Sequence, residues 1–144
     1  CTDNGDVDIV LKRSEDNGRT WTDFQVVRED STNTCAYGTP IVENTTGKII
    51  LLSTWNLEED HVTEIFWGKS NDTRRIFQQE SLDDGLTWTE PIEITSSVKK
   101  ENWTYYGLGY TSIIQLTQGE HAGRILTSAY HGKGALNRKV FYFY

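Results

Sequence analysis

The octet that decides the fold of this chain reads Ser14-Glu15-Asp16-Asn17-Gly18-Arg19-Thr20-Trp21. It returns 67 residues later as Ser81-Leu82-Asp83-Asp84-Gly85-Leu86-Thr87-Trp88, so that both copies fit the pattern S-x-D-[ND]-G-x-T-W. The segments that follow the two copies, 22–27 and 89–94, also correspond to each other. A turn, a tryptophan and an alternating strand that recur at this period predict a repeat architecture of small antiparallel sheets.

Each octet contains the residue types of a tight hairpin turn. The Asn-Gly or Asp-Gly dipeptide favours positive φ angles, and the aspartate before it can accept backbone N–H groups inside the turn. The serine can add a further local hydrogen bond. We expect each tryptophan to fold back over its own turn and to be largely buried there. The residues with these structural roles are Ser14, Asp16, Gly18, Trp21, Ser81, Asp83, Gly85 and Trp88.

Composition narrows the classes of partner. The 144 residues carry a formal net charge of −7, which argues against nucleic acid or an anionic membrane surface as a partner. An anionic substrate would therefore have to be held by a local cluster of arginines. No apolar run of about 18 residues indicates a transmembrane span. Cys1, Cys35 and three scattered histidines have neither the spacing of a disulfide framework nor that of a metal site, so we expect no metal and no cofactor.

Between the octets the chain alternates β-rich runs with turn residues. No helical period is sustained over ten residues, and we therefore predict an all-β fold. The clearest strands are 7–13, a hairpin of 41–42 with 49–55, the run 74–80, and a second hairpin of 112–116 with 125–130.

Several stretches, taken together, resemble one enzyme family. The double octet is similar to the Asp-box of sialidases. Further similarities lie in Thr39-Pro40-Ile41-Val42 with Thr46-Gly47-Lys48-Ile49, in 55–61 with 72–75, and in the turn 119–125. They resemble glycoside hydrolase family 33, and a bacterial subgroup of exo-sialidases in particular.

The resemblance implies a fold, an activity and a partner. The fold would be part of a six-bladed β-propeller with about two to three blades in this chain. Residues 1–30 would end one blade, 31–95 would form the next, and 96–144 would begin a third. The activity would be release of terminal sialic acid from a sialylated glycan by a secreted, periplasmic or cell-surface enzyme. The remaining blades would lie in a larger molecule.

The resemblance also assigns candidate site residues. Asp3 aligns with the family's acid/base, Glu64 with a glutamate that binds sugar hydroxyls, and Tyr130 with a pocket tyrosine. The residues alone allow other readings: Asp3 as a polar loop tip, Glu64 as a solvated charge, and Tyr130 as a rim or core residue. Tyr37, which stands with Gly38 where the family has Asn-Pro, is a further substrate-binding candidate.

Two adjacent arginines are candidate carboxylate binders. Because neighbouring strand residues face opposite ways, at most one of Arg74 and Arg75 can face a pocket. The other should be exposed to solvent or paired with an acid. The chain departs from the family at two places, with Tyr37-Gly38 in place of Asn-Pro and Gly109-Tyr110-Thr111 in place of Gly-Pro-Gly. By the resemblance, both lie at pocket-facing ends of strands, so we expect altered contacts with the substrate's N-acyl and glycerol groups.

Three functions remain open from the sequence. The favoured one is a retaining exo-α-sialidase whose three carboxylate-binding arginines and tyrosine nucleophile align outside residues 1–144. This chain alone would then be inactive. The alternative is a non-catalytic Asp-box propeller that binds glycans or proteins. The third is a family 33 enzyme that acts on another sugar acid or transfers the sugar.

Overall fold

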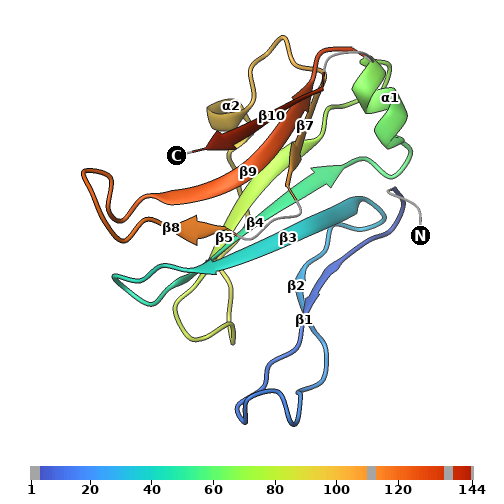
Figure 1. The fold of residues 1–144 in the computed structure, drawn as a ribbon. Helices are drawn as coiled ribbons and strands as arrows, with labels where there is room; N and C mark the ends of the chain where they lie inside the picture. The colour runs from blue at the N-terminus through green and yellow to red at the C-terminus, as the bar shows by residue number, and fades with distance from the viewer. Residues whose placement is uncertain (1–3, 110–112, 135–137, 144) are drawn as a thin grey trace.

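A computed structural model describes residues 4–109, 113–134 and 138–143, and it confirms the all-β prediction (Figure 1). The first sheet is a two-stranded antiparallel pair. The second has four antiparallel strands in the order β3-β4-β5-β6. The strands of these two sheets are β1 (Ile9–Leu11), β2 (Gln25–Arg28), β3 (Thr34–Val42), β4 (Ile49–Asn56), β5 (Arg75–Ser81) and β6 (Ile92–Glu93).

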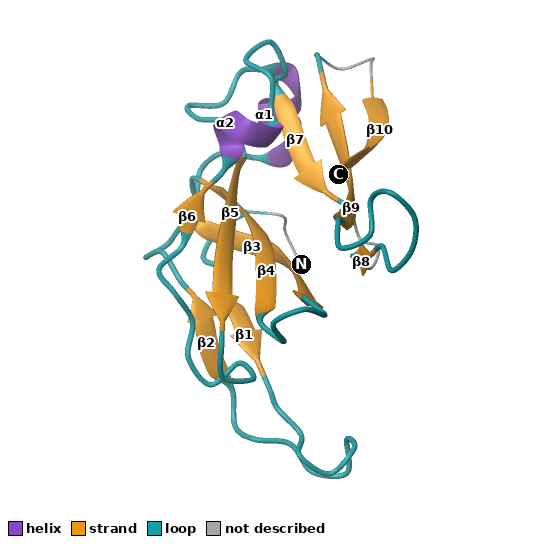
Figure 2. Cartoon of the chain, turned by 90° about the vertical axis from the view of Figure 1, so that its left-hand side faces the viewer, coloured by secondary structure: helices purple, strands orange, loops and turns teal. Residues whose placement is uncertain are grey.

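The third sheet has the order β10-β9-β7, with the short strand β8 also paired to β9. Two short helices, α1 and α2, lie at the same end of the second and third sheets (Figure 2). These elements are α1 (Val62–Trp67), α2 (Thr95–Val98), β7 (Tyr105–Leu108), β8 (Ile114–Gln115), β9 (Ile125–Gly132) and β10 (Arg138–Phe143). No helix in the described part of the chain is long and apolar enough to cross a membrane.

The second and third sheets share one apolar core. Ile76 on β5, Leu108 on β7 and Ala129 on β9 are all buried in it, together with Tyr106. The partly buried residues that pack against this core are Leu52, Ile94, Val98 and Trp103. Burial of each large apolar side chain contributes about 1.5–3 kcal/mol, so this contact holds the two sheets together.

A polar contact joins the same sheets at the β3–β4 turn. Gln115 on β8 accepts a hydrogen bond from the backbone N–H of Asn44, at 2.7 Å, and donates to the carboxylate of Glu43, at 3.0 Å. Thr46 and the backbone N–H of Thr45 also donate to Glu43. These bonds, that from Gln115 above all, hold the pKa of Glu43 well below its usual range. The predicted hairpin is confirmed, with Val42 opposite Ile49.

The two octets form nearly identical turns. In each, the aspartate accepts a hydrogen bond of 2.9 Å from the serine hydroxyl and another of 2.9 Å from the backbone N–H of the threonine. The residue before the glycine has a positive φ, 61° at Asn17 and 58° at Asp84. Hydrogen bonds from Thr20 and Thr87 are the main causes that lower the pKa of Asp16 and of Asp83 to about 2. Both turns lie at the end of the sheets away from α1 and α2 (Figures 1 and 2).

The expected burial of the two tryptophans is wrong for one of them. Trp21 donates from Nε1 to the Gly18 carbonyl, at 3.1 Å, but its side chain is 59% exposed. Trp88 is half-buried, because its turn packs closely against Leu11 of β1 and Ile49 of β4. No described strand covers the first turn in the same way, so a ring folded over its own turn stays open to solvent.

The aspartate inside the second turn should make stability depend on acid. A pKa depressed from 3.8 to about 2 stabilises the folded state above pH ~4, and this stabilisation is lost as the pH falls towards 2. In the intact protein, Asp83→Asn should therefore lower the melting temperature at pH 7 by several degrees. The gap to the wild type should narrow between pH 4 and pH 2.

Asp84→Asn is the matched control, because it recreates the Asn-Gly pair of the first octet and removes the same charge one residue away. It should melt close to the wild type. A gap for Asp83→Asn that stays constant on acidification, or an equal loss in both variants, would contradict the structural role of the Asp83 carboxylate.

Candidate functional site

Polar and aromatic side chains from the second and third sheets meet around one buried arginine. We call this group the Arg74 cluster. Arg74 immediately precedes β5, Asn56 ends β4 and Tyr37 belongs to β3, whereas the other two members come from β7 and β9. The members of the Arg74 cluster are Tyr37, Asn56, Arg74, Tyr105 and Tyr130.

The guanidinium of Arg74 is fully buried and is held by neutral groups. Its Nε donates to Asn56 Oδ1 at 3.1 Å, and its Nη1 donates to the Tyr105 hydroxyl oxygen at 2.7 Å. Its Cζ lies 5.3 Å from the ring centroid of Tyr37 and 5.2 Å from that of Tyr105, within range of a cation–π interaction. Among the described residues, its Nη2 has no hydrogen-bond partner, and no carboxylate forms an ion pair with the guanidinium.

The amide of Asn56 is itself fixed in orientation. Asn56 Nδ2 donates to the backbone carbonyl of Leu57 at 3.0 Å and to that of Asp60 at 3.4 Å. Its Oδ1 is therefore the atom turned towards Arg74. A buried charge is costly unless it is hydrogen-bonded, so this amide stabilises the guanidinium without neutralising it.

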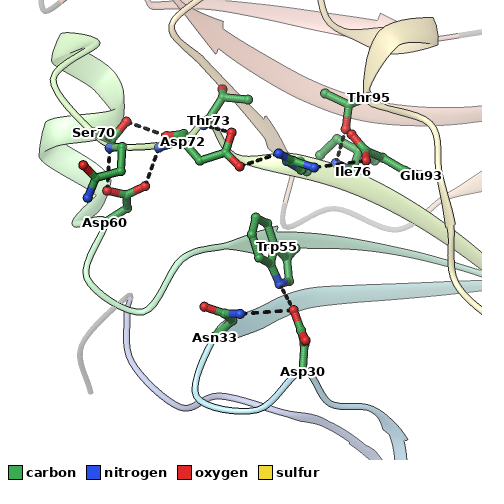
Figure 3. A network of polar contacts seen from close by, with 12 residues as sticks. Asp30, Asn33, Trp55, Asp60, Ser70, Asp72, Thr73, Ile76, Glu93 and Thr95 are labelled. Carbon is green, nitrogen blue, oxygen red and sulfur yellow. Dashed lines mark hydrogen bonds and ion pairs between the residues drawn. The ribbon is translucent and has the colours of Figure 1, made fainter.

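The two adjacent arginines point in opposite directions, as the strand alternation predicts. Arg75 forms ion pairs with Asp72 and Glu93 on the outer side of the sheet. The loop before it is held by the buried carboxylate of Asp60, which accepts the backbone N–H groups of Asn71 and Asp72 at 2.8 Å each (Figure 3). This row of contacts holds Arg75 outward, and Arg74 consequently points into the cluster.

Two glycines make room for the aromatic rings. Gly107 on β7 lies opposite Tyr130 on β9, and a Cβ at Gly107 would come within 2.9 Å of the rings of both Tyr105 and Tyr130. Gly132 lies opposite Tyr105, and a Cβ there would come within 2.8 Å of Phe66. Phe66, on α1, stacks on Tyr105 with 3.9 Å between ring centroids. The rings are therefore positioned by the absence of two side chains.

The hydroxyl groups of Tyr105 and Tyr130 lie 3.1 Å apart, with their rings tilted by 31°. Tyr105 is fully buried, and this burial raises its pKa well above the usual value for a tyrosine. It therefore keeps its proton at any ordinary pH. Tyr130 is only partly buried, so the pair runs from the interior towards the surface.

Tyr37 takes its place through an irregularity in β3. The β3–β4 register shifts between Ala36 and Thr39, and Tyr37 has a φ of 55°, which is uncommon for a residue other than glycine. This bulge brings the Tyr37 ring over Arg74. Such backbone strain is found preferentially at functional sites. Tyr37, one of the substrate-binding candidates from the sequence, thus supplies a ring to the cluster.

Of the residues that the sequence suggested for the site, the structure brings together Tyr37, Tyr130 and one of the two candidate arginines, Arg74. Tyr37 and Tyr130 are both members of the Arg74 cluster. Glu64 lies on the exposed first turn of α1, and its carboxylate has no hydrogen bond to a described residue. Asp3 lies outside the described residues.

The segment after Asp3 is tied to the neighbourhood of the cluster. Thr34, the first residue of β3, donates from its hydroxyl to the Gly5 carbonyl at 2.8 Å. Asn4 donates to the carbonyl of Glu58 in the β4–α1 connection, at 3.4 Å.

Sequence reasoning missed Asn56, Tyr105 and the two glycines beneath the rings. A signal was present in Tyr105-Tyr106-Gly107, where a tyrosine and a glycine two residues apart share one face of a strand. Nothing local in the sequence shows that Asn56 would meet Arg74, because the two are joined only by the pairing of β4 with β5.

Comparison with known proteins identifies the family. Residues 1–143 match the BNR repeat-like domain. This chain belongs to the BNR repeat-like family. The two octets are its Asp-box repeats, and the resemblance to sialidases is confirmed by the relatives described next.

Two similar proteins are sialidases. An exo-alpha-sialidase of Aspergillus fumigatus is 28% identical over 156 residues, covering 96% of this chain and 38% of the fungal protein. A sialidase of Clostridium perfringens is 32% identical over 107 residues, covering 68% of this chain and 26% of the clostridial protein. This chain therefore spans well under half of the length of either protein.

A solved structure shows the same fold. The Hadza microbial sialidase Hz136 superposes with a TM-score of 0.73 at 24% identity, over 86% of this chain and 26% of that chain. The predicted fold, part of a sialidase-type β-propeller, is confirmed.

The glycine beneath the tyrosine pair should be sensitive to a single methyl group. In the intact protein, Gly107→Ala should push the rings of Tyr105 and Tyr130 apart and destabilise the fold by about 1–3 kcal/mol, the usual effect of overpacking. The measurements are thermal unfolding and the near-ultraviolet circular dichroism of the aromatic side chains.

Gly119→Ala is the control, because a Cβ there would meet nothing within 4 Å although its φ of 81° also disfavours alanine. Gly119→Ala should lower the melting temperature because of its backbone conformation, without a change in the aromatic circular dichroism. Equal spectra for the two variants would mean that Gly107 does not position the rings.

Proposed function

We propose that the intact protein is a retaining exo-α-sialidase, secreted, periplasmic or at the cell surface, that removes terminal sialic acid from glycoconjugates. The proposal is supported by the similarity of nearly the whole chain to sialidases, together with the Arg74 cluster. This cluster places an unneutralised positive charge behind a tyrosine that reaches the surface. In a chain with net charge −7, such local positive charge favours an anionic sugar.

In this proposal Asp3 is the acid/base. Its carboxyl group protonates the departing glycosidic oxygen and later takes a proton from the water that releases the sugar. Enclosure of the site must keep this carboxyl protonated at the working pH. Sialidases depart from the usual pair of carboxylates by employing a tyrosine nucleophile, and the family resemblance implies that this tyrosine would lie outside residues 1–144.

The other candidate residues hold the substrate. Tyr130 and Tyr37 form part of the pocket wall, with Arg74 behind them. Glu64 binds sugar hydroxyl groups from α1 when the pocket is complete. By the same resemblance, the three arginines that would bind the substrate carboxylate by bidentate hydrogen bonds also lie outside residues 1–144.

A second function is favoured by the departures at the pocket. Because Tyr37-Gly38 and Gly109-Tyr110-Thr111 stand where the family has other residues, an Asp-box propeller that binds glycans or proteins without hydrolysis is the alternative. The two functions differ in whether the intact protein turns over sialosides, and only the hydrolase requires Asp3 as an acid/base.

Asp3→Asn tests the acid/base role in the intact protein. The substitution should spare folding and ground-state binding, and it should lower turnover of sialosides with poor leaving groups by roughly 10²–10⁴-fold. The loss should be smaller with an aryl sialoside, because a phenolate departs with little help from a proton. Steady-state kinetics with both substrates provide the measurement.

Asp6→Asn and Asp8→Asn are the matched controls, since both acids are exposed and lie within five residues of Asp3. Each should change turnover little. If Asp3→Asn changes turnover as little as Asp6→Asn, or if it lowers turnover of both substrates equally, Asp3 is not the acid/base. A wild type that binds sialosides without turnover would favour the binding function.

A further inference from the structure

The pair Tyr105–Tyr130 is more than a packing contact. We propose that Arg74 and Tyr105 are positioning residues that fix the direction of a hydrogen-bond chain, so that the Tyr130 hydroxyl donates to an acceptor oxygen of the bound sugar acid. The identity of the substrate rests on the proposed function, whereas the direction of the chain rests on the structure of the cluster alone.

The chain begins at a group that can only donate. A guanidinium carries N–H donors and no acceptor. The contact of 2.7 Å between Arg74 Nη1 and the Tyr105 hydroxyl therefore has one possible direction, with the Tyr105 oxygen accepting. Because Arg74 is charged, this hydrogen bond is stronger than one between neutral groups.

The second step follows from the burial of Tyr105. This side chain is fully buried, so its hydroxyl hydrogen needs an acceptor inside the protein. The acceptor that the described residues offer is the Tyr130 oxygen, 3.1 Å away. If Tyr130 donated to Tyr105 instead, the buried Tyr105 hydrogen would be left without an acceptor. The low-cost direction therefore runs from Tyr105 to Tyr130.

The last step assigns the proton of Tyr130. Since the Tyr130 oxygen accepts from Tyr105, its own hydrogen must point elsewhere, and it has no other hydrogen-bond partner among residues that the structure describes. Tyr130 is partly exposed, so this hydrogen is available to a ligand. The positive charge of Arg74 polarises both hydroxyls in the same sense and strengthens donation to an anionic or carbonyl oxygen.

The two tyrosine rings have little freedom to move out of this arrangement. Phe66 stacks on one face of Tyr105, and Gly107 leaves just enough room for Tyr105 and Tyr130 to meet. Arg74 is held on its other side by Asn56. The direction of donation is thus set before a ligand arrives.

Neutron diffraction from crystals of the intact protein without substrate tests the direction itself. The deuterium between the two phenol oxygens should belong to Tyr105, and that of Tyr130 should point away from Tyr105. A deuterium bound to Tyr130 and directed at Tyr105 would overturn the proposal, whatever the enzyme's activity.

A double-mutant cycle tests the role in binding. Tyr130→Phe should raise KM for a sialoside by about tenfold with a smaller change in kcat, because a donor to the substrate is lost. Tyr105→Phe should raise KM by about threefold, since Tyr130 keeps its hydroxyl but loses its orientation. The double variant should resemble Tyr130→Phe alone, because Tyr105 acts through Tyr130.

Tyr106→Phe is the matched control, since this buried tyrosine neighbours Tyr105 and packs in the apolar core. It should lower the melting temperature without changing KM. Independent, multiplying effects of Tyr105→Phe and Tyr130→Phe on KM would overturn the proposal.

The wild type, the two single variants and the double variant of the cycle should also be titrated with free sialic acid by calorimetry. This measurement separates the hydrogen-bond chain from the proposed hydrolase function. Binding that follows the cycle without any turnover means that the hydrolase function fails and the hydrogen-bond chain stands. A wild type that neither binds nor hydrolyses overturns the role of Tyr130 as a donor to a sugar acid.

Discussion

At the boundary between the two larger sheets, the guanidinium of Arg74 donates one hydrogen bond to Asn56 and another to Tyr105. No acid of the described residues pairs with it, so its stability depends on neutral oxygens and aromatic rings held at fixed places. That requirement explains features that otherwise look unrelated: the bulge at Tyr37, and glycines beneath the rings. A buried charge without a counter-ion lowers the stability of the fold, and the proposed binding of an anionic sugar accounts for its presence here.

The Asp-boxes solve a different problem at the opposite end of the sheets. Their aspartates satisfy the backbone N–H groups of a tight turn, which would otherwise be left unpaired. Neither box contacts the Arg74 cluster through any described hydrogen bond. The repeat that identifies the family is therefore structural, and the candidate site lies at the other end of the sheets.

The sequence predicted the elements better than the site. The octets, the hairpin of β3 with β4 and the opposite orientations of Arg74 and Arg75 follow from local rules for turns and strands. The exposure of Trp21 does not follow from such local rules, because its burial depends on which strand covers the turn. Asn56 and Tyr105 could not be chosen either, because they lie 18 and 31 residues from Arg74 in the sequence. The pairing of β4 with β5 brings Asn56 to Arg74, and the packing of the third sheet on the second brings Tyr105 there. Tyr37 and Tyr130 came from family resemblance, and the structure shows that Arg74, of the two candidate arginines, is the one that joins them in the cluster.

In the proposed function, this chain contributes an aromatic pocket wall, polarised by Arg74, to a sialic-acid site. The most direct test is a crystal structure of the intact protein with sialic acid bound. We expect an oxygen of the sugar at about 2.7–2.8 Å from the Tyr130 hydroxyl, the usual length of an O–H···O hydrogen bond, with Arg74 still bonded to Asn56 and Tyr105. A sugar bound away from Tyr130, or one that pulls Arg74 out of the cluster into direct contact, would contradict the account.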